Sequence, residues 1–399
     1  MKAGWRTERL GDVCQIIGGG TPSKANTSFY SGDIPWATVR DMRADLLSET
    51  EFKITKEAVK KSSTNIIPKD NVIIATRVGL GKVCLAQQDT AINQDLRGVV
   101  PNDYKKLSVK YLYSWFKSVS HKVVEEGTGA TVQGVKLPFI KSLQIPIPPI
   151  DEQQRIVAIL DQAFEGIAKA RANEEQNLQS ARALFESHLQ SVFTQRGEGW
   201  LEKTLIEVCE IKPPKNEAKK ILKNSDFVSF APMEDLGINQ KYLNPKKQRT
   251  LEDVAGSYTY FAEGDVLLAK ITPCFENGKL GIAKNLTNGI GFGSSEYIVF
   301  RPNKELSNEF LYYFLSRKRF IEKGAVRMSG AVGHKRVSKE FIEGYKIAFP
   351  LLEVQKELVK KIDALSKETQ RLEPLYQRKI ALLDELKKSL LQQAFAGEL

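Results

Sequence analysis

The sequence is poor in the residues that build metal centres, disulfide frameworks and membrane spans. It has 4 cysteines and 3 histidines among 399 residues, and no two cysteines stand in a C-x-x-C pattern. This usage excludes the common zinc motifs and predicts reduced thiols. No apolar run approaches the roughly 20 residues that a helix needs to cross a bilayer. The first residues, MKAGWRTERLGDV, lack the apolar core of a signal peptide. We therefore expect a cytoplasmic protein that holds no metal.

Motifs that would carry catalysis are also missing. The run GGGTPS at 18–23 lacks the G-x-G-x-x-G spacing of a dinucleotide site. The run RVGLGK at 77–82 lacks the first glycine of a phosphate-binding loop and the Ser or Thr that follows its lysine. Asn244-Pro245 is followed by two lysines instead of the proline–aromatic pair of an amino-methyltransferase site. The sequence therefore predicts no catalytic residue and a chain that is not an enzyme by itself.

What the chain has in excess is positive charge, and this charge is concentrated in two blocks. The formal net charge is +11 at pH 7. Residues 1–150 hold 21 Lys and Arg against 14 Asp and Glu, and residues 199–350 hold 24 against 18. The segments that follow the two blocks carry little net charge. Two basic blocks favour a polyanion that is contacted at two places, although a mild basic excess can also serve solubility alone.

The two basic blocks belong to an internal repeat. Landmarks recur in the same order at an offset of about 200 residues, with small insertions and deletions. LGDVC at 10–14 matches LIEVC at 205–209. A proline-containing junction, IPIPPIDEQ at 145–153, recurs as IAFPLLEVQ at 347–355. A period of this length is too long for a solenoid and indicates two copies of a domain followed by a helix.

Each junction is expected to start a long helix. Its prolines hold the chain extended, and Asp151 can cap the first helix. Apolar residues then recur in steps of four and three from Ile156 to Leu184, and again from Leu358 to Leu390. This period predicts a coiled-coil seam, which two helices of about 40 residues would bury against each other in an antiparallel pair. The alternative is that each helix packs onto its own domain.

The sequence therefore predicts an α+β fold in four segments. Two mixed domains at 1–150 and 199–350 are each followed by a helix, at 151–198 and 351–399, and pairing of the helices would relate the copies by a pseudo-two-fold axis. Pro374 should kink or divide the second helix. In the first domain we expect short strands at 34–39, 71–76, 98–101 and 141–146, and a helix at 109–118.

Two basic lobes that each precede a long helix and lack an active site resemble the specificity subunit of Type I restriction–modification enzymes. The stretches that carry the resemblance are GWRTERLGDVCQIIGGGTPSK, DIPWATVRDM, LPFIKSLQIPIPPIDEQQRIVAILD and LLDELKKSLLQQAFAGEL. The resemblance covers the whole chain. The second copy departs from it, because Lys212-Pro-Pro-Lys215 stands where the first copy has GGGTPS. This divergence fits two halves that read different sequences.

The resemblance implies a function for each part. The first lobe would be target recognition domain 1 and the second lobe target recognition domain 2. Each would read one half of a bipartite asymmetric site in double-stranded DNA. The helices would set the gap between the halves and dock two methyltransferase subunits, which use S-adenosylmethionine. Two restriction subunits that use ATP and Mg could join the complex. The cofactors would then belong to the partners, and none is expected in this chain.

The candidate DNA-binding residues are polar side chains in turns or at strand ends, where they can reach base edges or phosphates. In the first lobe they are Thr21, Ser23, Lys24, Arg40, Arg77, Lys82 and Lys136. In the second lobe they are Lys212, Lys215, Lys270, Lys279, Lys335 and Arg336. Each of these charges, taken alone, is more often only a solvated surface group. The candidate partner-binding residues, which need a partner if they do not pack within the helix pair, are Phe193, Leu390, Leu391 and Phe395.

Two other functions stay open on the sequence alone. One is an RNA-binding scaffold that stacks bases on aromatic residues, although the helical clustering of those residues is typical of a core. The residues in question are Trp115, Phe116, Tyr312, Tyr313 and Phe314. The other is a single-chain nuclease or methyltransferase with a diverged site. Preference for single-stranded RNA would favour the scaffold, and metal-dependent cutting or methyl transfer by the chain alone would favour the enzyme.

Overall fold

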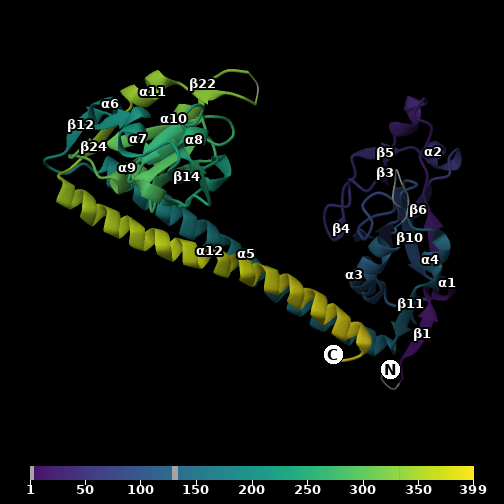
Figure 1. The fold of residues 1–399 in the computed structure, drawn as a ribbon. Coiled ribbons are helices and arrows are strands. Elements are labelled where there is room, and N and C mark those ends of the chain that lie inside the picture. Colours follow the sequence, from purple (N-terminus) through teal and green to yellow (C-terminus); the bar gives the residue numbers. More distant parts are fainter. Residues whose placement is uncertain (1–3, 128–133, 332) are drawn as a thin grey trace. The chain divides into compact units, whose positions relative to one another are not determined.

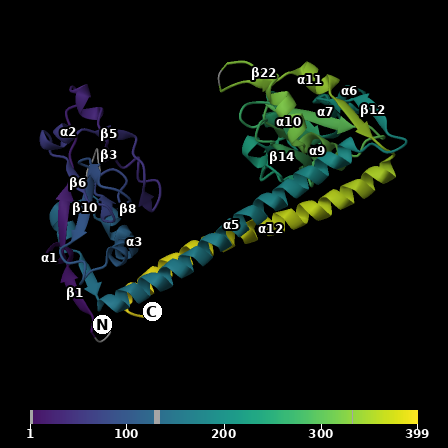
Figure 2. The same cartoon turned by 180° about the vertical axis from the view of Figure 1, so that it is seen from behind.

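The computed structural model describes residues 4–127, 134–331 and 333–399, and the chain divides into two compact units. Unit 1 joins Met1–Glu175 to Arg378–Leu399, and unit 2 is Gln176–Gln377. Each unit contains one α+β lobe and a stretch of both long helices, α5 (Ile150–Thr194) and α12 (Leu352–Ala396), as Figures 1 and 2 show. The boundary between the units therefore falls within the long helices.

The lobe of unit 1 is built from two sheets and a two-stranded ribbon. The five-stranded sheet has the order β2 (Cys14–Gly18), β10 (Leu96–Pro101), β7 (Val72–Ala75), β8 (Val83–Ala86) and β4 (Leu46–Leu47). The four-stranded sheet has the order β5 (Phe52–Ile54), β3 (Ile34–Ala37), β9 (Thr90–Ile92) and β6 (Asn65–Ile67). The ribbon pairs β1 (Arg6–Arg9) with β11 (Gln144–Ile147). The helices are α1 (Leu10–Val13), η1 (Thr27–Tyr30), α2 (Lys56–Lys60), α3 (Val109–Glu125) and α4 (Leu137–Ser142).

The lobe of unit 2 repeats this plan and adds a second two-stranded ribbon. Its five-stranded sheet has the order β13 (Cys209–Ile211), β21 (Tyr297–Pro302), β18 (Val266–Ala269), β19 (Leu280–Ala283) and β15 (Tyr242–Leu243). Its four-stranded sheet has the order β16 (Lys247–Thr250), β14 (Phe227–Ala231), β20 (Ile290–Gly293) and β17 (Thr259–Ala262). Two ribbons pair β12 (Leu201–Thr204) with β24 (Lys346–Phe349) and β22 (Met328–Ser329) with β23 (Arg336–Val337). The helices are α6 (Leu205–Val208), α7 (Asn216–Ile221), η2 (Met233–Asp235), α8 (Leu251–Val254), η3 (Thr287–Gly289), α9 (Asn308–Ser316), α10 (Lys318–Ala325) and α11 (Lys339–Gly344).

The strand register allows positions in the two lobes to be compared directly. In the first lobe Ala75 pairs with Leu96, and in the second Ala269 pairs with Tyr297 at the same place in the sheet. The expected strands at 34–39, 71–76 and 98–101 correspond to β3, β7 and β10, and are confirmed. The helix expected at 109–118 is longer and ends at Glu125. The last expected strand begins only at Gln144, because the residues before it form α4.

Each lobe packs a helix against its five-stranded sheet. On α3 the buried residues recur at helical spacing, including Tyr111, Trp115 and Phe116, as in an amphipathic helix. On α9 every residue from Phe310 to Leu315 is buried. Residues of the long helices join the same cores: Ile156, Leu160 and Leu391 in unit 1, and Leu189, Phe193 and Ile362 in unit 2. The start of each long helix therefore packs onto the lobe that precedes it, whereas the end of α5 packs onto the second lobe and the end of α12 onto the first. This differs from the alternative, in which each helix packs only onto its own domain.

The repeated junction is held by a buried glutamine in each unit. Gln153, on the first turn of α5, accepts a hydrogen bond from the Ser108 backbone N–H at 2.9 Å. Its amide donates to the carbonyl oxygens of Lys106 at 2.8 Å and Pro148 at 2.9 Å. Its side chain is fully buried, so the three bonds are shielded from water. The glutamine thereby ties the start of α5 both to the preceding proline segment and to the turn before α3.

The second junction repeats this clamp bond for bond. Gln355 accepts from the Ser307 N–H at 2.8 Å and donates to the carbonyls of Glu305 and Pro350, each at 2.8 Å. It is also fully buried. The sharp turn from strand to helix is therefore fixed by the same three backbone groups in both lobes.

Contacts between α5 and α12 occur within each unit. In unit 1 Arg155 donates at 2.7 Å to the carbonyl of Leu399, which lies just past the end of α12, and Glu174 pairs with Lys379 of α12 at 3.1 Å. As residue numbers rise along α5, the partners on α12 therefore fall. In unit 2 Arg182 pairs with Glu373 at 3.0 Å. The helix α12 runs through Pro374 without interruption, so the expected division of this helix is wrong.

Candidate nucleic-acid interface

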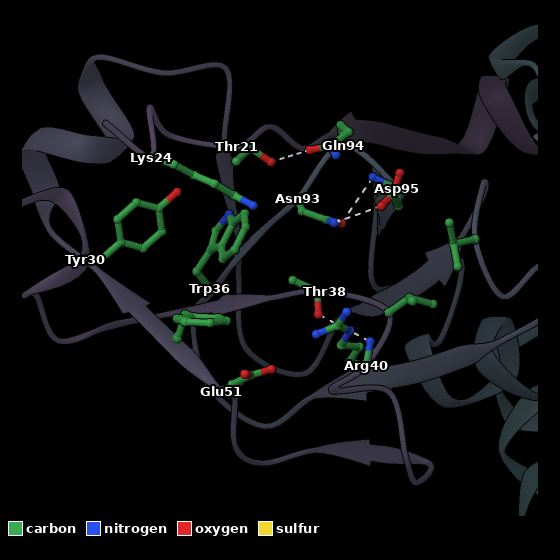
Figure 3. A pocket seen from close by; sticks show the side chains of 13 residues that line it. Thr21, Lys24, Tyr30, Trp36, Thr38, Arg40, Glu51, Asn93, Gln94 and Asp95 are labelled. Carbon is green, nitrogen blue, oxygen red and sulfur yellow. Dashed lines mark hydrogen bonds between the residues drawn. The ribbon is translucent and has the colours of Figure 1, made fainter. Parts of the chain in front are cut away.

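Three first-lobe candidates line one open cavity of about 850 Å³. Thr21 and Lys24 come from the chain between β2 and η1, and Arg40 comes from the turn after β3. Figure 3 shows Lys24, Tyr30 and Trp36 together on one side of the cavity, and Thr38 and Arg40 on the other. The fold therefore gathers candidates that are up to 19 residues apart in sequence around one concave surface.

The wall of this cavity is an aromatic cluster that is held by backbone acceptors. Trp36 is buried and its Nε1 donates to the Gly20 carbonyl at 3.1 Å. Tyr30 lies edge-on to Trp36 with ring centroids 6.0 Å apart, and its hydroxyl donates to the Pro22 carbonyl at 2.8 Å. Phe52 is 6.4 Å from both rings and remains 43% exposed. Trp36 and Tyr30 thus brace the Gly20–Pro22 turn, while Phe52 is free to meet an apolar group such as a thymine methyl.

Further polar residues that line the cavity come from the loop directly after β9. Asn93 is buried, and its Nδ2 donates to Asp95 Oδ2 at 3.0 Å while its Oδ1 accepts from the Asp95 N–H at 3.1 Å. Thr21 donates to Gln94 Oε1. Arg77 lies 3.6 Å from Asp95 Oδ1, which brings a fourth candidate to the rim. Sequence reasoning missed Asn93, Gln94 and Phe52, because no local pattern says that their loops meet Thr21.

The turn that carries Arg40 is rigidly held by a neighbouring carboxylate. Asp41 Oδ2 accepts from the Thr38 N–H at 2.7 Å and from the Thr38 hydroxyl at 2.9 Å. Asp41 Oδ1 accepts from the Glu51 N–H at 2.8 Å. Arg43 donates to the Arg40 carbonyl at 3.1 Å. The exposed Arg40 side chain forms no ion pair with the residues that the structure describes, so its five donors can serve a ligand.

The other first-lobe candidates lie apart from this cavity lining. Ser23 and Lys136 are exposed, and Lys136 precedes the first turn of α4. Lys82 donates to the Val39 carbonyl at 3.4 Å. In the second lobe Lys279, which occupies the matching position on the turn after β18, donates to the matching Met233 carbonyl at 2.8 Å. The two lysines hold the same loop in both lobes, a structural role that the sequence interpretation overlooked.

Two second-lobe candidates lie near Glu296, and one of them binds its carboxylate. Arg336 binds both oxygens of Glu296, at 2.9 and 2.8 Å, and hydrogen bonding from Arg336 holds the pKa of Glu296 below its ordinary value. Lys270 donates to the Ser295 carbonyl at 2.9 Å, and burial lowers the pKa of its ammonium. Glu296 matches Asp95 by register, so each lobe holds an acidic residue beside an arginine at this place.

The remaining second-lobe candidates are placed separately. Lys215 donates to the Gly256 carbonyl at 2.8 Å, which makes it a loop anchor. Lys212 is exposed and has a left-handed φ of 61°. Lys335 is exposed, and its carbonyl accepts from the Thr272 N–H at 2.9 Å. A cation that sequence reasoning missed is Arg249, which is exposed and lies 4.0 Å from the centroid of the Phe230 ring.

The partner-binding candidates pack, fully or in part, against the lobe cores. Phe193 and Leu391 are buried, with 5% and 7% of their surfaces exposed. Phe193 packs 4.8 Å from the Phe310 ring and Phe395 packs 5.1 Å from the Tyr111 ring. Leu390 also packs against the first-lobe core. Phe193 and Leu391 are therefore covered by the lobe cores, whereas Leu390 and Phe395 remain partly exposed.

Other apolar residues of the long helices are exposed instead. Leu184 on α5 is 61% exposed, and Leu382 and Leu386 on α12 are 50% and 46% exposed. Leu382 and Leu386 are four residues apart on one helix and share a face. Leu382 falls outside the predicted seam, but Leu184 and Leu386 were expected to lie in it, so the seam prediction is wrong at these two positions.

The aromatic residues that would support the RNA-binding alternative are inside the cores. The five residues, each at most 5% exposed, are Trp115, Phe116, Tyr312, Tyr313 and Phe314. They cannot stack bases without unfolding α3 or α9, so this ground for the alternative is wrong. Three cysteines, Cys14, Cys84 and Cys209, are buried free thiols, and burial raises the pKa of each to about 12. Within the three described ranges, no helix is long and apolar enough to cross a membrane, and no cluster of three His, Cys, Asp or Glu could hold a metal ion.

Comparison with known proteins identifies related sequences over most of the chain. The family model described as the Type I restriction modification DNA specificity domain matches residues 2–177 and 197–380. The EcoR124I/EcoR124II specificity subunit of Escherichia coli is 38% identical over 164 residues, which are 39% of this chain and 40% of that protein. This match thus spans less than half of the length of that relative. The MjaVIII specificity subunit of Methanocaldococcus jannaschii is 22% identical over 424 residues, covering 99% of this chain and 93% of that protein.

Solved structures share the fold over the full chain. A chain from a study of the assembly and conformational transition of the type I R-M system aligns with a TM-score of 0.77 at 20% identity, covering 100% of this chain and 99% of that one. The HsdS subunit of Thermoanaerobacter tengcongensis aligns with a TM-score of 0.62 at 19% identity, covering 100% and 98%. At these identities the likeness concerns the fold, which is two tandem α+β domains with long helices.

Proposed function

We propose, from the premise that this chain belongs to the Type I restriction modification DNA specificity family, that its two lobes read the two halves of a bipartite, asymmetric site in double-stranded DNA. The observation that carries this proposal is one strand plan used twice with different side chains on it. The first lobe has the cavity around Trp36, whereas the second lobe has Arg249 over Phe230 at the matching strand. A shared strand plan with different surface side chains suits an asymmetric site.

In the first lobe we assign the contacts with DNA to the exposed side chains around the cavity. Arg40 lies on a firmly held turn, and its guanidinium can bind guanine O6 and N7 together. Lys24 and Thr21 can bind phosphates or base edges, and Phe52 can contact a thymine methyl. In the second lobe Lys212, Lys335 and Arg249 are exposed and are the corresponding groups.

The long helices are the spacer between the half-sites. This part of the proposal is supported by the reverse order of the α5–α12 contacts in unit 1 and by the Arg182–Glu373 pair in unit 2. An antiparallel coiled coil of this kind would relate the two lobes by a pseudo-two-fold axis. The clamps at Gln153 and Gln355 would fix the direction in which each lobe leaves its helix, and thereby the gap between the half-sites.

The same helices are the docking surface for two methyltransferase subunits. Exposed leucines such as Leu382 and Leu386 are the side chains we assign to this contact, in place of the buried Phe193 and Leu391. Methyl transfer from S-adenosylmethionine would occur on these partners, and restriction subunits that use ATP and Mg would join the same complex. The chain itself is the non-catalytic specificity subunit and acts on cytoplasmic DNA.

The test is a comparison of genomic adenine methylation in cells with the methyltransferase partner and either the wild-type chain or no chain. We expect methylation at one motif made of two short half-sites with a fixed gap, and its loss without the chain. The variant Arg40→Ala should change or relax one half-site only, and Lys304→Ala, at an exposed site with no assigned contact, should change neither. A methylome that does not depend on the chain would overturn the proposal and would return RNA binding to consideration.

A further inference from the structure

A pocket in unit 2 is lined by positively charged side chains and includes none of the second-lobe residues that we assign to DNA contacts. Its volume is about 310 Å³, and it is formed where the end of α5 meets α9, α10 and the β12–β24 ribbon. Its charged lining residues are Arg196, Arg317, Arg319, Lys323 and Lys346. None of its lining residues is an aspartate or glutamate. A concave surface with charges of one sign concentrates anions.

Arg317 is the fixed element of this pocket. The residue is only 6% exposed, and its Nε donates to the Phe314 carbonyl at 2.9 Å. The guanidinium lies 4.0 Å from the centroid of the Phe314 ring and 4.7 Å from that of Phe193. These contacts orient the planar group, while its remaining N–H donors stay available to the pocket that it lines.

This buried cation has no counter-charge in the part of the chain that the structure describes. No aspartate or glutamate there forms an ion pair with Arg317, and none forms one with Arg319 or Lys323. Burial, with a contribution from Arg319, lowers the pKa of Arg317 to about 10, so the group is still charged at pH 7. A desolvated charge without a partner destabilises a fold, and an anion in the pocket would relieve that cost.

Two of the five cations are partly neutralised. Glu202 on β12 pairs with Arg196 at 2.5 Å and lies 3.7 Å from Lys346. This carboxylate therefore compensates one side of the pocket. The uncompensated charge is concentrated around Arg317, on the α10 side.

The first lobe indicates that the architecture does not require these charges. Ser118 stands at the position of Arg317 and donates to the Trp115 carbonyl at 2.7 Å, which is the bond that Arg317 makes to Phe314. The matching of the two sites follows from the preceding caps, since Ser108 and Ser307 are both bound by the junction glutamines. A neutral side chain is thus sufficient for this bond.

A second position repeats this difference. Gln144, which pairs with β1, stands where the second lobe has Lys346 by the register of the ribbon. The first lobe therefore has neutral residues at the positions of Arg317 and Lys346. The positive charge at these two positions is not needed for the shared fold.

We propose that this pocket binds a phosphoryl group, with Arg317 as an oriented fork of donors and Arg319 and Lys323 as the surrounding cations. A carboxylate would neutralise only one of these three charges, whereas a phosphoryl group brings up to two charges and three acceptor oxygens. The group can belong to a free polyphosphate, as in a nucleotide, or to a nucleic-acid backbone. The inference does not depend on the proposed DNA specificity.

The first test measures binding of tripolyphosphate to the full chain by titration calorimetry. We expect one molecule per chain, with affinity reduced at least tenfold in Arg317→Ser and in Arg319→Ser. Arg317→Ser copies the first lobe and keeps a donor for the Phe314 carbonyl, so thermal unfolding should confirm that it folds. Lys304→Ser removes one exposed positive charge elsewhere in unit 2 and should leave the affinity unchanged.

The second test identifies the source of the phosphoryl group. Affinity for a duplex of unrelated sequence is measured against salt concentration, where each lost phosphate contact lowers the log–log slope by about 0.9. A smaller slope in Arg317→Ser and Arg319→Ser, relative to Lys304→Ser, assigns the pocket to the DNA backbone. An unchanged slope with loss of tripolyphosphate binding assigns it to a free polyphosphate. If both variants match Lys304→Ser in both measurements, the inference is wrong, whatever the outcome for DNA specificity.

Discussion

The junction glutamines allow the sharpest test of how the lobes are attached to their helices. In Gln355→Met the side chain keeps its length and most of its volume but loses the amide. Three buried backbone groups then lose their partner: the Ser307 N–H and the carbonyls of Glu305 and Pro350. The first turn of α12 would no longer be tied to the turn before α9.

The expected cost follows from these three groups. A buried polar group that loses its partner costs about 1–3 kcal/mol. Taking the lower end for each, since the turn can relax, Gln355→Met should destabilise unit 2 by about 3 kcal/mol. Gln377→Met is the matched control on the same helix, because that glutamine is exposed, and it should fall within about 0.5 kcal/mol of the wild type.

The assay is urea unfolding combined with hydrogen exchange resolved by peptide. Exchange should accelerate at Ser307 and in the first turns of α12, while the first junction at Gln153 keeps its protection, because it belongs to unit 1. If Gln355→Met and Gln377→Met have the same stability and the same exchange, the clamp does not hold the joint. The direction in which each lobe leaves the proposed spacer helices would then have to be fixed by other contacts.

Three further outcomes are expected. Asp265→Ala should destabilise the second lobe by about 3 kcal/mol in chemical denaturation, because Arg301 loses a buried carboxylate that it binds at 2.8 Å through two nitrogens. Cys274 should react first with iodoacetamide at pH 8, as followed by mass spectrometry, since burial raises the pKa of the other three thiols to about 12. Glu296→Gln should make the protein lose less stability at low pH. Because Arg336 lowers the folded pKa of Glu296, the ion pair stabilises the fold fully above the unfolded pKa of about 4.3, and this stabilisation is lost as the pH falls below that value. Equal acid sensitivity of variant and wild type in denaturation curves would contradict this.

The repeat and the long helices could be predicted because their signals are local or periodic. Proline at the junction restricts the backbone whatever surrounds it, and apolar steps of four and three define a helix face without reference to a partner. The alignment of Gln153 with Gln355 was also visible in the sequence. Its meaning was not, because the three backbone groups that each glutamine binds lie in segments brought together only by folding.

The candidate site was predicted less completely, for the same reason. Thr21, Lys24 and Arg40 do meet at one cavity, but Asn93 and Phe52, which complete its lining, lie on loops that no spacing rule connects to them. Lys82 was indistinguishable from Arg40 as a positive charge in a turn. Only the structure gives Lys82 a carbonyl acceptor and leaves Arg40 free of an ion pair among the described residues.

The sequence by itself determined that this protein is a duplicated basic α+β domain with a helix after each copy. The internal repeat, the positive charge and the spacing of apolar residues depend only on the order of residues in the chain. Tertiary structure decided which apolar residues of those helices are available. Leu391 and Leu386 are both leucines of the same helix, yet Leu391 is covered by the first-lobe core and Leu386 is 46% exposed. Burial depends on what folds against a side chain, and that partner is more than 200 residues away in sequence.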